Sequence, residues 1–118
     1  MRPHEKLDVW KKFMDLVLEV YKHTEHFPKE ERYGLTSQIR RSAVSVPANI
    51  AEGAARDSAR EFAHFLSNAQ GSASELETEI QIAYRLGYLD ETVYSDIREA
   101  LDNAGRMLIG LSRKVRGK

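Results

Sequence analysis

The sequence contains no cysteine and has little proline or glycine, with three and seven residues of these types among 118. The absence of cysteine excludes disulfides, thiolate metal sites and cysteine nucleophiles. No linker rich in serine, glycine or proline interrupts the chain, so neither a disordered segment nor a domain boundary is indicated. Because 42% of the residues are hydrophobic, we expect a single domain with one core over residues 1–118.

Long hydrophobic runs are also lacking. No apolar stretch approaches the length of a bilayer-spanning helix, and the first residues, MRPHEKLDVW, do not have the apolar centre of a secretory signal peptide. These absences predict a cytoplasmic protein with no membrane partner.

Neither sign of charge is in excess, since 18 basic residues balance 18 acidic ones. A neutral chain gives little support for strong, sequence-independent binding to nucleic acid. The one obvious basic cluster is at the C-terminus and comprises Arg113, Lys114, Arg116 and Lys118. Such residues commonly complement the dipole at a helix end. Alternatively they contact nucleic acid, and a symmetric oligomer would gather several copies of the cluster.

Apolar residues recur at helical spacing in four segments, and no segment shows the alternation of a strand. Ser58 and Glu61 form a capping-box pattern, Gly87 marks a helix end, and Asp90 is a second expected cap. The expected helices cover Leu7–Thr24, Gly34–Ala55, the segment between Ser58 and Gly87, and the segment after Asp90. Short connections imply antiparallel neighbours, so the predicted fold is all-α, an antiparallel up-down-up-down four-helix bundle.

The first helix has an unusually wide apolar surface. One seam comprises Leu7, Trp10, Met14, Val17 and Tyr21, and a second comprises Val9, Phe13, Leu16 and Val20. With Leu18 added, the apolar arc exceeds half of the circumference. This excess predicts burial against a second subunit as well as against the bundle; deeper burial within its own bundle is the alternative.

The segment LTSQIRRSAVSVPANIAEG, from Leu35 to Gly53, combines a core stripe with a polar one. The apolar stripe consists of Leu35, Ile39, Ala43, Val46, Ile50 and Ala54. The polar stripe consists of Gln38, Ser42, Ser45 and Asn49, which need hydrogen-bond partners in a neighbouring helix, a second subunit or a ligand. The apolar register continues through Pro47, so we predict a continuous helix that is kinked there; if the proline breaks it, Ser45 would cap the second half.

Two further features concern where helices meet. Gly53 to Asp57 predicts a tight corner after the second helix. In the third helix, small residues from Gly71 to Ser74 mark a place where another helix can approach closely.

Catalytic patterns are scarce. A carboxylate-bridged metal centre in a bundle needs two Glu-x-x-His pairs, and the sequence has one, Glu61 and His64, whose glutamate is better explained by the capping box. No nucleophile elbow or phosphate-binding glycine loop is present. We therefore expect no enzyme activity, no catalytic residue, no metal and no cofactor.

Two interpretations remain open for the arginines of the central segment. In the first, Arg41, Asn49, Glu52 and Glu75 belong to a polar network that fixes register at a helix or subunit interface, with Glu75 and Glu79 as partners for Arg40 and Arg41. In the second, a basic face for phosphates is formed by Arg40, Arg41, Arg56 and Arg60.

The segment from Leu35 to Gly53, together with EFAHFLSNAQGSASELET from Glu61 to Thr78, resembles the four-helix-bundle family first named from proteins encoded in intervening sequences of 23S ribosomal RNA genes. The resemblance implies assembly as a ring-like homopentamer. It also implies a relation to accessory proteins of diversity-generating retroelements, which bind nucleic acid and a reverse transcriptase through a strongly basic surface. It supplies no catalytic residue, and it places Arg41, Asn49, Glu52 and Glu75 at motif positions that we interpret as structural.

These observations leave three hypotheses. The first is a non-enzymatic, oligomeric scaffold or binding module for an RNA or protein partner. The second is a nucleic-acid-binding accessory protein, for RNA or DNA, that uses the C-terminal cluster and the arginines of the second helix. The third and weakest is a metal-dependent enzyme inside the bundle.

Overall fold

The computed structural model describes residues 1–117, which form four long α-helices and two short 3-10 helices, with no strand in that range. The elements are η1 (Pro3–Lys6), α1 (Asp8–Thr24), η2 (Lys29–Glu31), α2 (Leu35–Ala54), α3 (Ala59–Arg85) and α4 (Glu91–Val115). The all-α prediction and the four-helix bundle are confirmed, and Lys118 of the predicted basic cluster lies outside the described residues.

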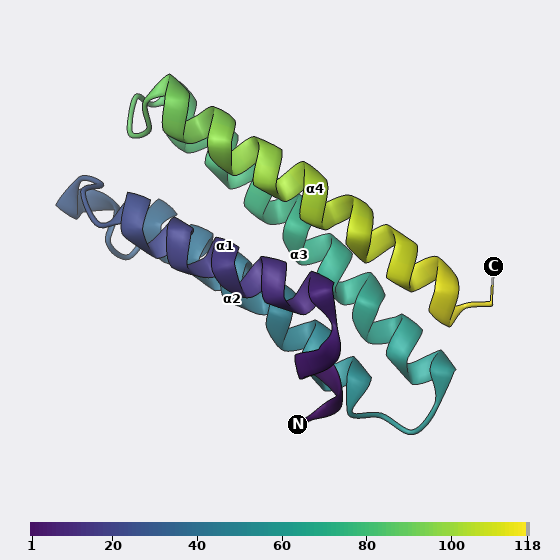
Figure 1. Cartoon of the computed structure of the whole chain (residues 1–118). Coiled ribbons are helices and arrows are strands. Elements are labelled where there is room, and N and C mark those ends of the chain that lie inside the picture. Colours follow the sequence, from purple (N-terminus) through teal and green to yellow (C-terminus); the bar gives the residue numbers. More distant parts are fainter. Residues whose placement is uncertain (118) are drawn as a thin grey trace.

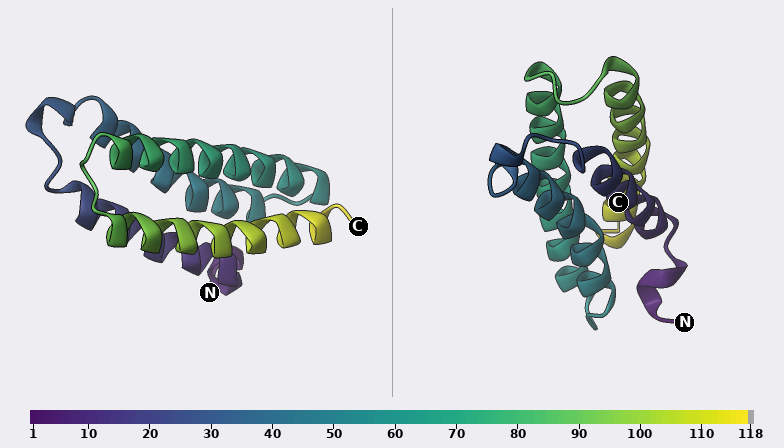
Figure 2. Two further views of the ribbon diagram at one scale, coloured as in Figure 1. Left: turned by 90° about the horizontal axis from the view of Figure 1, so that it is seen from above. Right: turned by 90° about the vertical axis from the view of Figure 1, so that its left-hand side faces the viewer.

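The four helices lie around one long axis, and the molecule measures 43 × 24 × 23 Å. Figure 1 shows the chain reversing its direction at each of the three connections between long helices. α2 packs against α1 and α3, and α4 packs against α3 and α1 (Figure 2). The α1–α2 pair and the α3–α4 pair therefore present opposite outer faces.

Ser58 and Asp90 cap helices as predicted, but among the described residues the Glu61 carboxylate does not make the return bond that would complete the predicted capping box. Ser58 Oγ accepts a hydrogen bond from the Glu61 backbone N–H at 3.1 Å, and Asp90 Oδ1 accepts one from Val93 N–H at 2.8 Å. α3 ends at Arg85, and the turn after it contains Gly87, whose φ of 83° is accessible to glycine at little cost. The next N–H, of Tyr88, closes the turn on the Ala83 carbonyl at 2.9 Å.

Each long helix contributes one buried stripe to a single core. The largest side chains in this core that are almost wholly hidden from solvent are Phe13, Val20, Ile39, Val46, Ile50, Leu66, Leu76, Ile80 and Leu108. Burial of such side chains contributes about 1.5 to 3 kcal/mol each relative to exposure. The core is thus continuous along the bundle, as the spacing of apolar residues predicts.

The two apolar seams of α1 have different environments. The seam of Val9, Phe13, Leu16 and Val20 is buried in the bundle. In the other seam Leu7, Trp10 and Val17 are partly buried against the core, whereas Met14 and Tyr21 are exposed, and so is the neighbouring Leu18. The bundle therefore uses only part of the apolar arc of α1.

α2 is a continuous helix through Pro47, whose ring is buried. The predicted continuity is confirmed, while the kink stays a prediction. α2 and α3 approach closely at Gly53. Of the predicted small residues Gly71 to Ser74, Ser72 also meets α2, at Ser45, whereas Gly71 does not. A Cβ on Gly53 would come within 2.8 Å of Phe65 Cβ and 2.9 Å of Phe62 Cδ1, whereas a Cβ on Gly71 would meet nothing within 4 Å. The corner after α2 accordingly begins only at Ala55.

Candidate functional site

The polar stripe of α2 finds hydrogen-bond partners within α2 and on α3. Ser45 Oγ and Ser72 Oγ are 2.8 Å apart, so one hydroxyl donates to the other across the helix pair. Asn49 Nδ2 donates to the Ser45 carbonyl at 2.8 Å and to Ser45 Oγ at 3.1 Å. These contacts satisfy half-buried polar groups within the chain itself. They favour a structural role for this stripe over a ligand site.

One carboxylate beside this stripe is less well accommodated. Glu79 Oε1 is buried and accepts no hydrogen bond from the part of the chain that the structure describes. Burial raises the pKa of Glu79, the negative charge of Glu75 raises it further, and the Ser42 hydroxyl opposes both effects. Glu79 is therefore a destabilising charge at neutral pH.

Arg40 stabilises the end of α1 instead of pairing with an acidic residue of α3. Its Nε donates to Thr24 Oγ1 at 2.9 Å and its Nη2 donates to the Tyr21 carbonyl at 3.2 Å. The guanidinium also lies 4.5 Å from the centre of the Tyr21 ring. Arg40 thus binds carbonyl and hydroxyl oxygens at the negative end of the α1 dipole.

No hydrogen bond or ion pair joins the four residues of the predicted polar network to one another within residues 1–117. Asn49 bonds to Ser45, and Glu52 pairs with Arg56 at 3.1 Å on an exposed surface. Arg41 and Glu75 are exposed, and neither forms a hydrogen bond or ion pair with any of residues 1–117. A contact of Arg41 or Glu75 across a subunit interface stays a prediction.

The predicted basic residues fall into two separate groups. The first group, Arg40 and Arg41, lies in the first half of α2. Arg56 follows the end of α2 and belongs to neither group. Arg60 is in the first turn of α3, and Arg113, Lys114 and Arg116 are at the end of α4. Since the start of α3 and the end of α4 lie at the same end of the bundle (Figure 1), the second group is gathered there. We call the surface of Arg60, Arg113, Lys114 and Arg116 the basic end.

Acidic and aromatic side chains moderate the charge next to the basic end. Arg56 pairs with Glu52, approaches Glu61 at 3.9 Å and lies 4.9 Å from the centre of the Phe65 ring. Arg60, Arg113, Lys114 and Arg116 are all exposed. These four residues, without Arg56, are thus the cations that remain available to an anionic partner.

An apolar ridge runs along the outer face of the α1–α2 pair. Met14, Leu18 and Tyr21 recur at helical spacing on α1 and are 40%, 69% and 41% exposed, and Val44 on α2 is 42% exposed. We call these four residues the ridge. Arg40 links the two helices beneath Tyr21. Large apolar side chains gathered on a solvent-exposed face are typical of protein contact surfaces.

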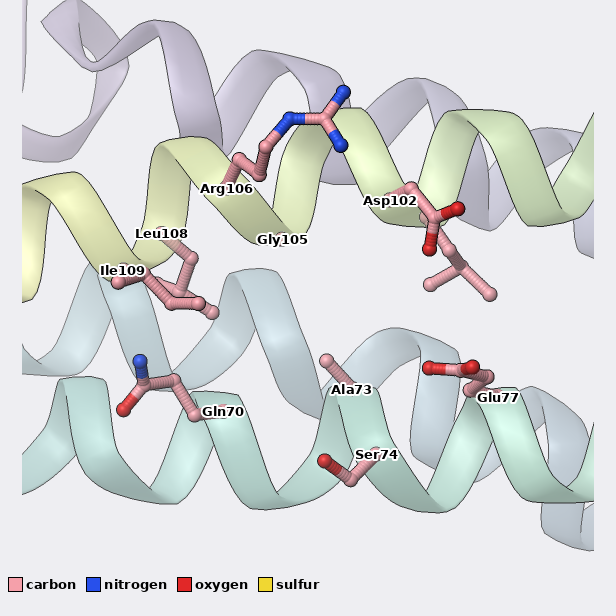
Figure 3. Close-up of a pocket in the computed structure, with 10 residues that line it drawn as sticks. Gln70, Ala73, Ser74, Glu77, Asp102, Gly105, Arg106, Leu108 and Ile109 are labelled. Atoms are coloured by element: carbon pink, nitrogen blue, oxygen red, sulfur yellow. The ribbon is translucent and has the colours of Figure 1, made fainter.

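A groove of about 440 Å³ lies on the opposite pair, between α3 and α4. Its apolar lining includes Ala73, Leu101, Leu108 and Ile109, and Gly105 leaves the α4 side open, because a Cβ there would meet no atom within 4 Å. Figure 3 shows the side chains of Glu77 and Asp102 facing one another across one part of the groove. The sequence does not directly predict this groove; the signals that could have indicated it are the mid-helix glycine at Gly105 and the small residues Ala73 and Ser74.

Glu77, on the α3 side of the groove, is paired with Arg98 of α4. Arg98 Nη2 approaches Glu77 Oε1 at 3.5 Å, and Arg98 Nη1 donates to Tyr94 Oη at 2.7 Å. Tyr94 stacks on Tyr84, with ring centres 4.1 Å apart. Asp102 has no ion pair of this kind among residues 1–117, so it is the carboxylate that the groove offers to a partner.

Glu61 and His64, the one Glu-x-x-His pair of the sequence, have separate surroundings. Glu61 is an exposed residue at the start of α3 and His64 packs edge-on against Phe65. In residues 1–117 no three histidine, aspartate or glutamate side chains are grouped as metal ligands. None of the helices in this range combines the length and apolar character that crossing a membrane requires.

The fold defines the class of the protein as an all-α four-helix bundle. Residues 5–110 match the family of 23S rRNA-intervening sequence proteins, and the chain belongs to this family.

A solved structure supports the fold independently. The chain is similar to a protein of unknown function from the S23 ribosomal protein family of Bacteroides thetaiotaomicron, with a TM-score of 0.80 and 24% sequence identity. The similarity covers 89% of this chain and 98% of that one. A search of curated proteins found no match.

Proposed function

We propose that this protein is a non-enzymatic scaffold or binding module that works as a homo-oligomer, with the ridge as a self-association surface. The resemblance to the family makes a homopentamer the expected stoichiometry. The observation that carries the proposal is the exposure of Met14, Leu18, Tyr21 and Val44 on one face of a chain whose core is otherwise complete.

The chemistry around the ridge favours a second copy of the chain as the occupant. Lys22 and Arg41 are exposed near it, and neither forms an ion pair with another residue in the range 1–117. Since 18 basic residues balance 18 acidic residues, copies of the chain do not repel one another through net charge. Association would cover apolar surface that contributes about 25 cal/mol for each Å² removed from water.

Light scattering coupled to size exclusion tests this proposal. The unmodified protein is expected to have a molar mass several times the 13.5 kDa of one chain, and Leu18→Glu is expected to lower it by placing a charge on the ridge. Leu86→Glu is the matched control, because Leu86 is 54% exposed at the end of α3, away from the ridge. A wild-type protein that remains a monomer at micromolar concentration would contradict the proposal.

A second candidate function is nucleic-acid binding at the basic end. It is favoured by the convergence of Arg60 with Arg113, Lys114 and Arg116, which the fold brings together from distant parts of the sequence. In a ring, several such ends would act together on one strand. The neutral total charge indicates that any such binding depends on this local cluster.

Retention of structured RNA at graded salt concentrations tests the second candidate. Replacing Arg113, Lys114 and Arg116 with glutamine is expected to weaken binding and to reduce its salt dependence. The matched control replaces Lys29, Arg32 and Arg85 with glutamine, since these exposed cations lie near the opposite end of the bundle. Equal loss in both variants would show non-specific attraction, and no retention of the wild type would refute the candidate.

A further inference from the structure

We propose that the groove between α3 and α4 receives the ridge of a second copy of the chain, so that assembly is head-to-tail. The inference rests on the proposed self-association and adds the surface that the ridge contacts. The inference starts from two complementary features that lie on opposite faces of one bundle. One feature protrudes and is apolar, and the other is hollow and has an apolar lining.

The groove is suited to a helix. It runs between two antiparallel helices, and Gly105 widens it at a position where α4 gains nothing from a glycine within its own chain. Glycine in a helix interior costs roughly 0.5 to 1 kcal/mol relative to alanine. The space above Gly105 admits the close approach of another helix without displacing any atom of the bundle.

The chemistry of α1 matches this groove. Leu18, at 69% exposed, supplies an apolar side chain, and Lys22 lies one helical turn later on the same side. The groove supplies Leu108 and Ile109 as apolar contacts and Asp102 as a carboxylate. In Figure 3 the Arg106 side chain points away from the opening, and its guanidinium donates to Asn103. The apolar and acidic parts of the groove thus remain accessible to Leu18 and Lys22.

The placement of the two surfaces decides the kind of assembly. The ridge belongs to the α1–α2 pair and the groove to the α3–α4 pair, which face in opposite directions (Figure 2). A chain therefore cannot fill its own groove, and each contact leaves one free ridge and one free groove. Such heterologous contacts close into a ring or continue as a filament, whereas a ridge-to-ridge contact would stop at a dimer.

A complementation experiment separates these alternatives. Leu18→Glu damages the ridge, and Gly105→Leu fills the groove without meeting any atom within 4 Å of its Cβ. We expect each variant alone to stop assembling. An equimolar mixture should form a heterodimer of twice the 13.5 kDa monomer mass, since one intact ridge and one intact groove remain. Native mass spectrometry identifies the two chains.

Controls make each outcome informative. Gly110→Leu introduces the same change on the same helix at an open position that does not line the groove, and it should assemble like the wild type. Ile109→Lys is a second groove variant, and circular dichroism verifies that both groove variants fold. If the wild type assembles and both groove variants do so equally well, the groove inference fails while the proposed self-association stands. A monomeric wild type overturns both, and a mixture without heterodimer overturns the head-to-tail contact.

Discussion

Gly53→Ala is the substitution whose effect the packing of α2 against α3 defines most sharply. A Cβ at this position would lie 2.8 Å from Phe65 Cβ, 2.9 Å from Phe62 Cδ1 and 3.3 Å from the Phe62 carbonyl oxygen. Ordinary carbon contacts are at about 3.5 Å or more, so the helices must separate by about 0.7 Å at Phe65, and the ring of Phe62 must move as well. Because Phe65 Cβ and the Phe62 carbonyl are attached to the α3 backbone, rotation of one side chain cannot relieve the contact.

The expected magnitude follows from two opposing effects. Overpacking a close contact costs about 1 to 3 kcal/mol, and replacing glycine by alanine in a helix returns up to about 1 kcal/mol. We expect Gly53→Ala to lower the free energy of unfolding by up to about 2 kcal/mol. At this chain length each kcal/mol lowers the midpoint of thermal unfolding by about 3 to 6 °C.

Urea unfolding followed by circular dichroism, at one protein concentration, measures this difference. Gly71→Ala is the matched control on α3, because a Cβ there meets nothing within 4 Å. The control is expected to stabilise the protein by roughly 0.5 to 1 kcal/mol. If Gly53→Ala were as stable as Gly71→Ala, the close approach of α2 and α3 at this point would be refuted.

Two other predictions concern single polar side chains. Because the folded pKa of Glu79 is raised above its usual 4.5, its contribution to stability is present below pH 4.5 and is lost as pH rises through the folded pKa. Glu79→Gln should therefore raise the free energy of unfolding at about pH 7 and approach the wild type below pH 4.5; a variant less stable than wild type at neutral pH would contradict this reasoning. Arg40→Ala should cost about 1 to 2 kcal/mol by removing the contacts to Thr24 and Tyr21. Arg40→Lys should not restore them, because one ammonium lacks the planar fork that reaches both oxygens; full rescue in urea unfolding would refute that role.

The helices could be predicted from the sequence because their ends depend on local chemistry. Ser58, Gly87 and Asp90 act on backbone groups within one turn, so their effect is visible without the tertiary structure. The predicted segments Leu7–Thr24 and Gly34–Ala55 differ from α1 and α2 by a residue at their ends.

The candidate site was less predictable because it depends on which faces meet. Arg40 was assigned acidic partners on α3, yet helix rotation directs it to Thr24 and Tyr21 on α1. Similarly, the small residues from Gly71 to Ser74 predict a close approach, which Ser72 makes to Ser45 of α2 while Gly71 faces open space, but they do not predict the approach at Gly53. Periodicity identifies the faces of a helix, but the pairing of those faces is a property of the whole bundle.

Part of the motif that marks the family is committed to the contact between α2 and α3. Asn49 is bonded to Ser45, which meets Ser72 on α3, and Gly53 admits Phe62 and Phe65. A residue engaged in this way cannot also select a partner without weakening the helix pair. Partner choice therefore depends on exposed positions, some within the family segments, such as Val44 of the ridge and Ala73 of the groove, and some outside them. Leu18 on the ridge and Gly105 in the groove are such positions, and substitutions there should alter assembly while leaving the bundle folded.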